Sequence, residues 1–240
     1  NSQPMGFYAP AQLVRDAQQH GVQVRPIDVN HSQWDCSLET ASIGSGTSAE
    51  ASYDLRLGFR LIRGLSVADA RKIEEARGEQ PFVSMQDFTR RTHLGRAVVV
   101  RLSQADAFAT LGCHRRQALW EALAQDRSGR DTTEKHPLFA RLPPEDDLPV
   151  SLPPPTSLEQ VFADYDTTGL SLKAHPLSFY REPLQRLRVK TASQLLEIRH
   201  NQHVRVAGLV LLRQRPSTAK GITFVTLEDE TGTMNWVIHQ

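Results

Sequence analysis

Residues 204–239 are the only long part of the chain with the pattern of β-structure, and they most constrain how it can fold. From 204 to 212 the side chains alternate at a period of two, which places one set on one face of a strand. Turn residues interrupt the pattern at 216–221 and 229–232, and β-branched and aromatic side chains resume it each time. An antiparallel meander of three strands is therefore predicted.

Basic and aromatic side chains accompany this meander. Arg213, Arg215 and Lys220 lie beside its first turn, and Phe224 and Trp236 lie in its later strands. On an OB-type sheet this combination holds single-stranded nucleic acid, because bases stack on the rings while cations pair with phosphates. An ordinary sheet with a solvated basic rim has the same pattern, and both interpretations stay open.

Composition indicates an ordinary folded protein with uneven charge. The 240 residues leave room for about two domains, and 39% of them are hydrophobic. The net charge is only +1, but residues 55–130 hold 14 Lys or Arg against 8 Asp or Glu. A local basic bias of this kind is what binding to phosphates requires.

The cysteines and the absence of long apolar runs indicate a cytoplasmic protein. Cys36 and Cys113 are far apart and have no Cys or His at metal-ligand spacing, so two free thiols in a reducing compartment are expected. No run approaches the roughly 18 apolar residues of a membrane span, and no signal peptide opens the chain. Because residue 1 is Asn rather than Met, we expect a fragment.

From residue 55 the pattern is helical. A serine stands three residues before an acid at 66–69, 84–87 and 103–106, the spacing of a capping box, so each predicts a helix start. The first follows Leu-Ile-Arg-Gly-Leu at 61–65, which predicts a helix-hairpin-helix. A weaker second copy is predicted at 102–112, before a basic helix start at 114–116.

A hairpin of this kind can bind phosphate without a charged side chain. Its backbone N–H groups and the helix N-terminus point at the anion, and Arg63 and Lys72 add to the positive field. A plain antiparallel helix pair that turns at a glycine has the same signature, so this alternative stays open.

Residues 126–156 are predicted to be a Pro-rich acidic linker. Inside it, Leu138 and Phe139 form an apolar pair that either docks in a partner's groove or packs back on its own domain. A helix is expected to begin at residue 157, and two more are expected at 178–187 and 191–200. Near the N-terminus, the pattern predicts a short helix at 11–21 and an edge strand at 22–29.

The chain contains none of the common catalytic motifs. We find no P-loop, no nucleophile elbow, no HExxH and no set of zinc ligands. Acidic runs at 145–147 and 228–230 lie in a linker and in a tight turn, whereas two-metal sites need rigidly held carboxylates. No catalytic residue, metal site or cofactor is therefore predicted, and both acidic runs are expected to be solvated.

Several short stretches, in this order, resemble the bacterial C-family (DnaE-type) DNA polymerases. Those shared with the whole family are QPMGFY at 3–8, VN to WDC at 29–36, RLG at 56–58 with IRGL at 62–65, PF at 81–82, ADAF at 105–108, and LG at 111–112 with RRQAL at 115–119. Those similar to the error-prone, translesion branch are DY at 164–165 through TGLSLKAHP at 168–176, and VAGLV at 206–210 through RQRP at 213–216 to AKG at 219–221.

The resemblance implies an α+β multidomain chain downstream of the polymerase palm. Implied parts are the end of the fingers region at 1–50, a tandem helix-hairpin-helix domain at 51–125, the linker at 126–156, a helical connector at 157–203 and a truncated OB-type domain at 204–240. The family's carboxylates, which bind two Mg²⁺ ions, and its PHP domain would lie upstream. This chain alone is therefore expected to be inactive.

The implied function is to grip DNA during error-prone synthesis past lesions. Ser66 replaces the second glycine of a strong hairpin, a departure that weakens the phosphate site expected there. The rival hypothesis is an interaction scaffold that docks on a sliding clamp, or on accessory translesion proteins, through Leu138 and Phe139. The residues expected to contact duplex or single-stranded DNA are Arg63, Gly64, Leu65, Ser66, Lys72, Arg115, Arg116, Arg205, Arg213, Arg215, Lys220, Phe224 and Trp236.

Overall fold

A computed structural model describes residues 9–40, 53–130, 152–216 and 221–239. The chain divides into two compact units, residues 1–172 and 173–240, and each is described by itself. Within the described ranges, no helix is both long and apolar enough to cross a membrane. The architecture is α+β, as the sequence predicts, with most helices in the first unit and a three-stranded antiparallel sheet in the second.

The first unit begins with a helix and a small mixed sheet. Helix α1 (Pro10–Gln19) precedes the strands β1 (Val24–Arg25), β2 (Ser37–Thr40) and β3 (Tyr53–Arg56). Strand β3 is central, parallel to β1 and antiparallel to β2. Pro26, which has no N–H to donate, follows β1 directly and limits the expected strand at 22–29 to two residues. The domain boundary expected at 50/51 does not coincide with a gap in the packing, because β3 pairs with both earlier strands.

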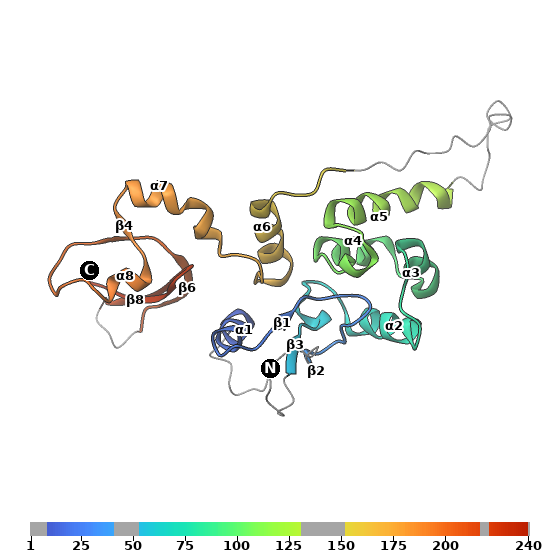
Figure 1. Ribbon diagram of the computed structural model, residues 1–240, viewed down its shortest axis with the longest axis horizontal. Coiled ribbons are helices and arrows are strands. Elements are labelled where there is room, and N and C mark those ends of the chain that lie inside the picture. The colour runs from blue at the N-terminus through green and yellow to red at the C-terminus, as the bar shows by residue number, and fades with distance from the viewer. Residues whose placement is uncertain (1–8, 41–52, 131–151, 217–220, 240) are drawn as a thin grey trace, which may run out of the picture. The chain divides into compact units, whose positions relative to one another are not determined.

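Short helices make up the rest of this unit. They are η1 (Phe59–Leu61), α2 (Val67–Arg77), α3 (Met85–Thr92), α4 (Arg96–Gln104), η2 (Ala109–Leu111), α5 (Arg115–Arg130) and α6 (Ser157–Thr168). Helices α4 and α5 lie side by side (Figure 1). Helix α5 includes 126–130, which were expected to belong to the linker, and most of the remaining linker lies outside the described residues.

Two of the three predicted capping boxes start helices. The hydroxyls of Ser66 and Ser84 each accept a hydrogen bond from the amide three residues later, at 3.1 Å, and α2 and α3 begin there. The third prediction was wrong. Ser103 is fully buried inside α4 and donates to the Val99 carbonyl at 2.9 Å. A serine that bonds back to its own helix cannot cap a new one.

Three phenylalanines form the centre of the first core. Phe88 packs edge-to-face against both Phe82 and Phe108, with ring centroids 5.0 Å apart in each pair. All three rings are buried. Their spacing is the one aromatic pairs prefer, and the contacts join α3 to the segment that precedes it and to the segment after α4.

The second unit holds the predicted meander. Strands β6 (Leu209–Gln214), β7 (Thr223–Asp229) and β8 (Gly232–Ile238) pair in the order β6-β7-β8, all antiparallel. In the described residues this sheet does not close into a barrel. It is preceded by η3 (Pro176–Tyr180), α7 (Arg181–Arg186), β4 (Val189–Lys190), α8 (Ala192–Leu195) and β5 (Arg205–Val206). The helix expected at 178–187 is formed by η3 and α7 in succession, whereas the one expected at 191–200 is limited to α8.

The turn between β7 and β8 is held by a buried carboxylate. Asp229 accepts hydrogen bonds from the amides of Thr231 at 2.8 Å, Gly232 at 3.0 Å and Ala192 at 2.7 Å. Its neighbour Glu230 accepts a hydrogen bond from Arg181 at 2.7 Å. The acidic run at 228–230 was expected to be solvated, but these contacts give two of its carboxylates a structural role. Asp229 ties the start of α8 to the sheet.

Gly58 gives the sharpest test of packing in the first unit. An added Cβ would lie 2.4 Å from the Asp35 carbonyl carbon and 2.5 Å from the Trp34 carbonyl oxygen, both in the backbone. We expect Gly58→Ala to lower the free energy of unfolding by about 3 kcal/mol or more. Gly95→Ala is the control, because nothing lies within 4 Å of its added Cβ, and it should cost only about 0.5 kcal/mol. Chemical denaturation measures both, and equal effects would contradict the backbone clash.

The Asp229 network predicts a pH dependence of the second unit. Burial alone would raise the pKa of Asp229, but the hydrogen bonds from Thr231, Ala192 and Gly232 outweigh it and lower the pKa. A carboxyl with a lowered folded pKa stabilises the fold at neutral pH, and this stability is lost as the pH falls below about 4. Asp229→Asn should lower the free energy of unfolding by about 1–3 kcal/mol at pH 7. It should also weaken the loss of stability between pH 7 and pH 3, which thermal unfolding over this range measures.

Candidate nucleic-acid interface

Two hairpin turns in the first unit share the same features at three successive positions. The first is Gly64, Leu65 and Ser66 before α2, and the second is 93–95 (His-Leu-Gly) before α4. In each, the first residue has a positive φ (76° and 49°), the leucine is buried, and the third is an extended N-cap. Helices α2 and α4 therefore begin after the same kind of turn.

A second turn of this kind joins α3 to α4, where the sequence predicted none. The copy predicted at 102–112 ends in a similar turn, because Gly112 has a φ of 68°, Cys113 is buried and α5 begins at Arg115. His93 occupies the position of Gly64, and Gly95 occupies that of Ser66. Histidine is among the residues that tolerate a left-handed backbone, which disguised the repeat. A leucine followed by a small residue and a helical pattern is the signal both turns share.

The arm before the first turn is also shorter than expected. A full helix was predicted there, but only the single 3-10 turn η1 follows β3. The Leu65 amide donates to the Ile62 carbonyl at 3.3 Å, so it holds the turn and does not face a ligand. Of the turn amides expected to bind phosphate, those of Gly64 and Ser66 have no acceptor within the described part of the chain.

The first turn of α2 adds two more such donors. The amides of Val67 and Ala68 have no acceptor among the described residues, whereas the Asp69 amide is capped by Ser66. Unpaired N–H groups at a helix start form a ready anion site because the helix dipole adds positive charge there. Ser66, the expected weak point, therefore keeps the geometry by acting as the N-cap.

Basic side chains lie on the two helices that follow the turns. Lys72 is exposed on α2, and Arg96 is exposed at the start of α4. An added Cβ at Gly64 would lie 3.0 Å from the Arg101 Nε, so the Arg101 side chain of α4 lies against the first turn. Of these cations, only Lys72 was singled out from the sequence.

Arg63 has a structural contact that the sequence did not reveal. Its amide donates to the Thr167 carbonyl at 2.9 Å, and its Nη1 donates to the Asp166 carbonyl at 3.0 Å. Both acceptors belong to the last turn of α6, whose carbonyls have no helical partner. Arg63 thus ties α6 beside the first hairpin turn.

Arg115 is buried, so it cannot be a surface contact for DNA in this fold. Its guanidinium pairs with Asp164 and donates to the Gln160 carbonyl at 2.9 Å. The neighbouring Arg116 remains partly exposed and pairs with Glu159 at 3.2 Å. Both arginines were expected to contact phosphates, but Arg115 instead joins α5 to α6.

The two aromatic rings of the meander lie on opposite faces of the sheet. Trp236 pairs with the buried Val225, whereas Phe224 pairs with the exposed Val237. Directly paired residues share a face and successive residues alternate, so the rings cannot form one stacking surface. Arg213 pairs with Val225 and lies on the Trp236 face. This register corrects the expected grouping of Phe224 and Trp236.

The remaining predicted residues fall into two groups. Arg205 is exposed and donates to the Leu187 carbonyl at 3.4 Å, and Arg215 is exposed beyond the end of β6. Lys220, Leu138 and Phe139 lie outside the described residues. No group of three His, Cys, Asp or Glu side chains within the described ranges could hold a metal ion.

The arginine pair at the start of α5 gives a matched comparison. Arg115→Ala would leave the carboxylate of Asp164, 13% exposed, without its cation, and should cost about 3–5 kcal/mol of unfolding free energy. Arg116→Ala removes an exposed pair and should cost less than about 1 kcal/mol. Urea unfolding of both variants checks this. A small effect at Arg115 would contradict its role in holding α6.

Comparison with known proteins agrees with the hairpin geometry. The family described as a helix-hairpin-helix motif matches residues 21–118, a range that contains both turns. Over 99% of its length the chain is 52% identical to the error-prone DNA polymerase of Rhodopirellula baltica and 46% identical to that of Methylococcus capsulatus. It is 48% identical to error-prone DNA polymerase 2 of Rhizobium meliloti.

These relatives are much longer than the chain. The matched region is 20% of the Rhodopirellula protein, 23% of the Methylococcus protein and 22% of the Rhizobium protein. The match extends across both structural units and not only the hairpins. The chain is thus homologous, over nearly its whole length, to one part of the bacterial error-prone (DnaE-type) DNA polymerases, and it spans about a fifth of the relatives it matches.

Proposed function

We propose that this chain is a DNA-binding part of an error-prone DNA polymerase. The repeated hairpin turn carries the proposal, because each copy presents a helix start beside exposed basic side chains. Two equivalent turns in one unit suit the repeating phosphates of a duplex backbone. The names of the relatives and the matched hairpin family support the same function.

The proposed contacts with DNA are of two kinds, backbone amides and cationic side chains. The amides of Gly64, Ser66 and Val67 would donate to a phosphate oxygen of the duplex, and Lys72 and Arg96 would pair with neighbouring phosphates. Such contacts fix position without reading sequence. A polymerase that copies damaged templates needs this tolerance, so synthesis past lesions is the role we propose. Nucleotidyl transfer with its Mg²⁺ ions would then belong to other parts of such a polymerase.

The sheet of the second unit is proposed as a weaker contact for the template strand. Arg213 and Trp236 share one face, and Arg205 is exposed on β5, so cations and a ring are available on that side. Phe224 lies on the other face and would act separately.

A proline substitution tests the amide contact without changing charge. Val67 is the first residue of α2, where proline fits a helix, and the preceding Ser66 already has the extended backbone (φ −94°, ψ 156°) that proline requires. Val67→Pro removes one N–H donor. Affinity for primed duplex DNA should fall about ten-fold, with the salt dependence unchanged, because no cation is lost. Ser157→Pro at the equivalent position of α6 is the control and should bind normally.

Lys72→Ala tests the cationic contact in the same binding assay. Here both the affinity and the slope of log K against log salt should fall, the slope by about 0.9 for one lost phosphate contact. The exposed Arg199, in the second unit, supplies the control Arg199→Ala. Unchanged binding by both Val67→Pro and Lys72→Ala, with normal melting curves, would show that this surface does not hold DNA.

A further inference from the structure

The second unit contains a basic pocket that belongs neither to the hairpin turns nor to the meander. Its volume is about 490 Å³, and it lies where α7 leads into β4 and β5. Four of its seven lining residues are Lys or Arg, and none is acidic. The lining residues are Arg186, Leu187, Arg188, Lys190, His203, Val204 and Arg205.

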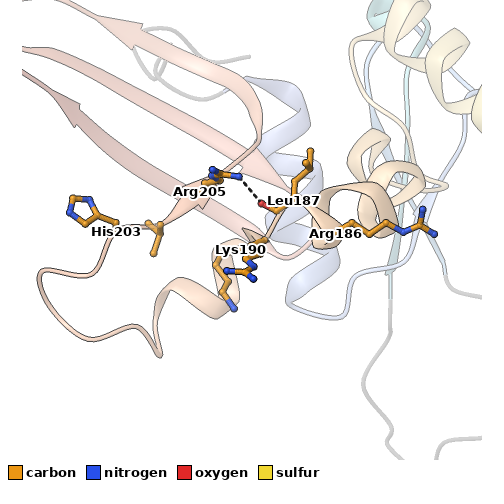
Figure 2. Close-up of a pocket in the computed structure, with 7 residues that line it drawn as sticks. Arg186, Leu187, Lys190, His203 and Arg205 are labelled. Atoms are coloured by element: carbon orange, nitrogen blue, oxygen red, sulfur yellow. Dashed lines mark hydrogen bonds between the residues drawn. The ribbon is translucent and has the colours of Figure 1, made fainter.

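The cations of this pocket differ in how they are engaged. Arg186 pairs with Glu182 on its own helix, and Figure 2 shows its guanidinium directed away from Lys190 and Arg205. Arg205 donates to the Leu187 carbonyl at 3.4 Å and so is held over the pocket. The side chains of Arg188 and Lys190 have no hydrogen-bond or ion-pair partner in the described part of the chain. Two permanent cations are therefore left for an external anion.

The backbone conformation brings the positive charges of the pocket close together. Arg188 has a left-handed conformation (φ 59°), which costs an L-residue free energy, and its amide closes a turn on the Gln185 carbonyl at 2.8 Å. Strands β4 and β5 then pair in parallel, with Lys190 opposite Val206 and Val189 opposite Arg205. This pairing brings Arg205 beside residues about fifteen positions earlier in the chain. Like charges gathered without carboxylates repel one another, and a bound anion relieves that repulsion.

The pocket continues into an apolar groove. The groove, of about 630 Å³, shares Leu187, Val204 and Arg205 with the pocket and also contains Trp236. A ligand that fits both cavities has a phosphate group joined to a flat apolar ring. A nucleotide unit of a single strand has this chemistry, because its base can stack on an indole while its phosphate pairs with cations.

We propose that Arg188, Lys190 and Arg205 form a phosphate-binding site for single-stranded nucleic acid. A backbone phosphate binds in the pocket, and its base extends toward Trp236. This inference rests on the proposed DNA-binding function, and it extends the template contact of the second unit to Arg188 and Lys190, which neither the sequence pattern nor the hairpin family indicates.

The test uses the 240-residue chain and a fluorescent oligothymidylate of about 12 nucleotides. The double variant Arg188→Asn with Lys190→Gln removes both unpartnered cations, and Asn tolerates the positive φ at 188. We expect about ten-fold weaker binding and a salt slope lower by about 1.4, the value for two lost contacts on a single strand. A second double variant, Arg188→Gly with Lys190→Gln, should show the same loss of affinity. Agreement between the two variants would exclude a folding defect as the cause.

The matched control is Lys173→Gln with Arg199→Gln, two exposed cations of the same unit outside the pocket. If the control lowers the affinity as much as the pocket variant, binding depends on net charge and the inference is overturned. It is also overturned if the pocket variant binds the oligonucleotide normally but loses a heat of binding for inorganic pyrophosphate, because the site would then take free phosphate groups.

Duplex binding separates this inference from the proposed function. The pocket variant should keep the affinity for primed duplex that Val67→Pro loses. If Val67→Pro weakens duplex binding while the pocket variant leaves single-strand binding unchanged, only the inference falls. If neither variant affects either ligand, both proposals fall.

Discussion

The stability of the first unit depends on two arginines that pair with polar groups of α6. This helix follows a long intervening segment, and it carries terminal carbonyls that have no partner within the helix and a nearly buried carboxylate at Asp164. Arg63 donates to the carbonyls, and Arg115 pairs with the carboxylate. Leaving the carboxylate without its cation would cost about 3–5 kcal/mol, and each buried carbonyl without a donor about 1–3 kcal/mol. Two arginines are therefore engaged within the protein.

This requirement shapes the candidate DNA surface. With Arg115 buried and Arg63 bonded to α6, the exposed cations Lys72 of α2 and Arg96 of α4 remain as candidates for contacts with phosphates. Arg63 still contributes indirectly, because its bond to α6 fixes the segment that leads into Gly64. The proposed phosphate site would thus consist of backbone donors with cations around them, an arrangement that does not depend on the DNA sequence.

The sheet of the second unit has a buried polar network at one turn and an apolar groove on one face. Asp229 fixes the β7–β8 turn and the start of α8, whereas Val225 and Trp236 line a groove. Because strand residues alternate between faces, this groove side and the Phe224 side have different neighbours. A ligand on one face would not contact the other, so Phe224 and Trp236, grouped from their places in the predicted strands, belong to two separate surfaces.

The sequence by itself determined the local features: the meander, the Ser66 and Ser84 caps, and the resemblance to error-prone polymerases, because each depends on neighbouring residues. It missed the turn at 93–95, since His93 adopts a positive φ that is expected of glycine. Only the tertiary structure decided which arginines are buried, which face each ring occupies, and that Arg188, Lys190 and Arg205 meet. Those outcomes depend on strand register and on contacts between distant segments, and local pattern specifies neither.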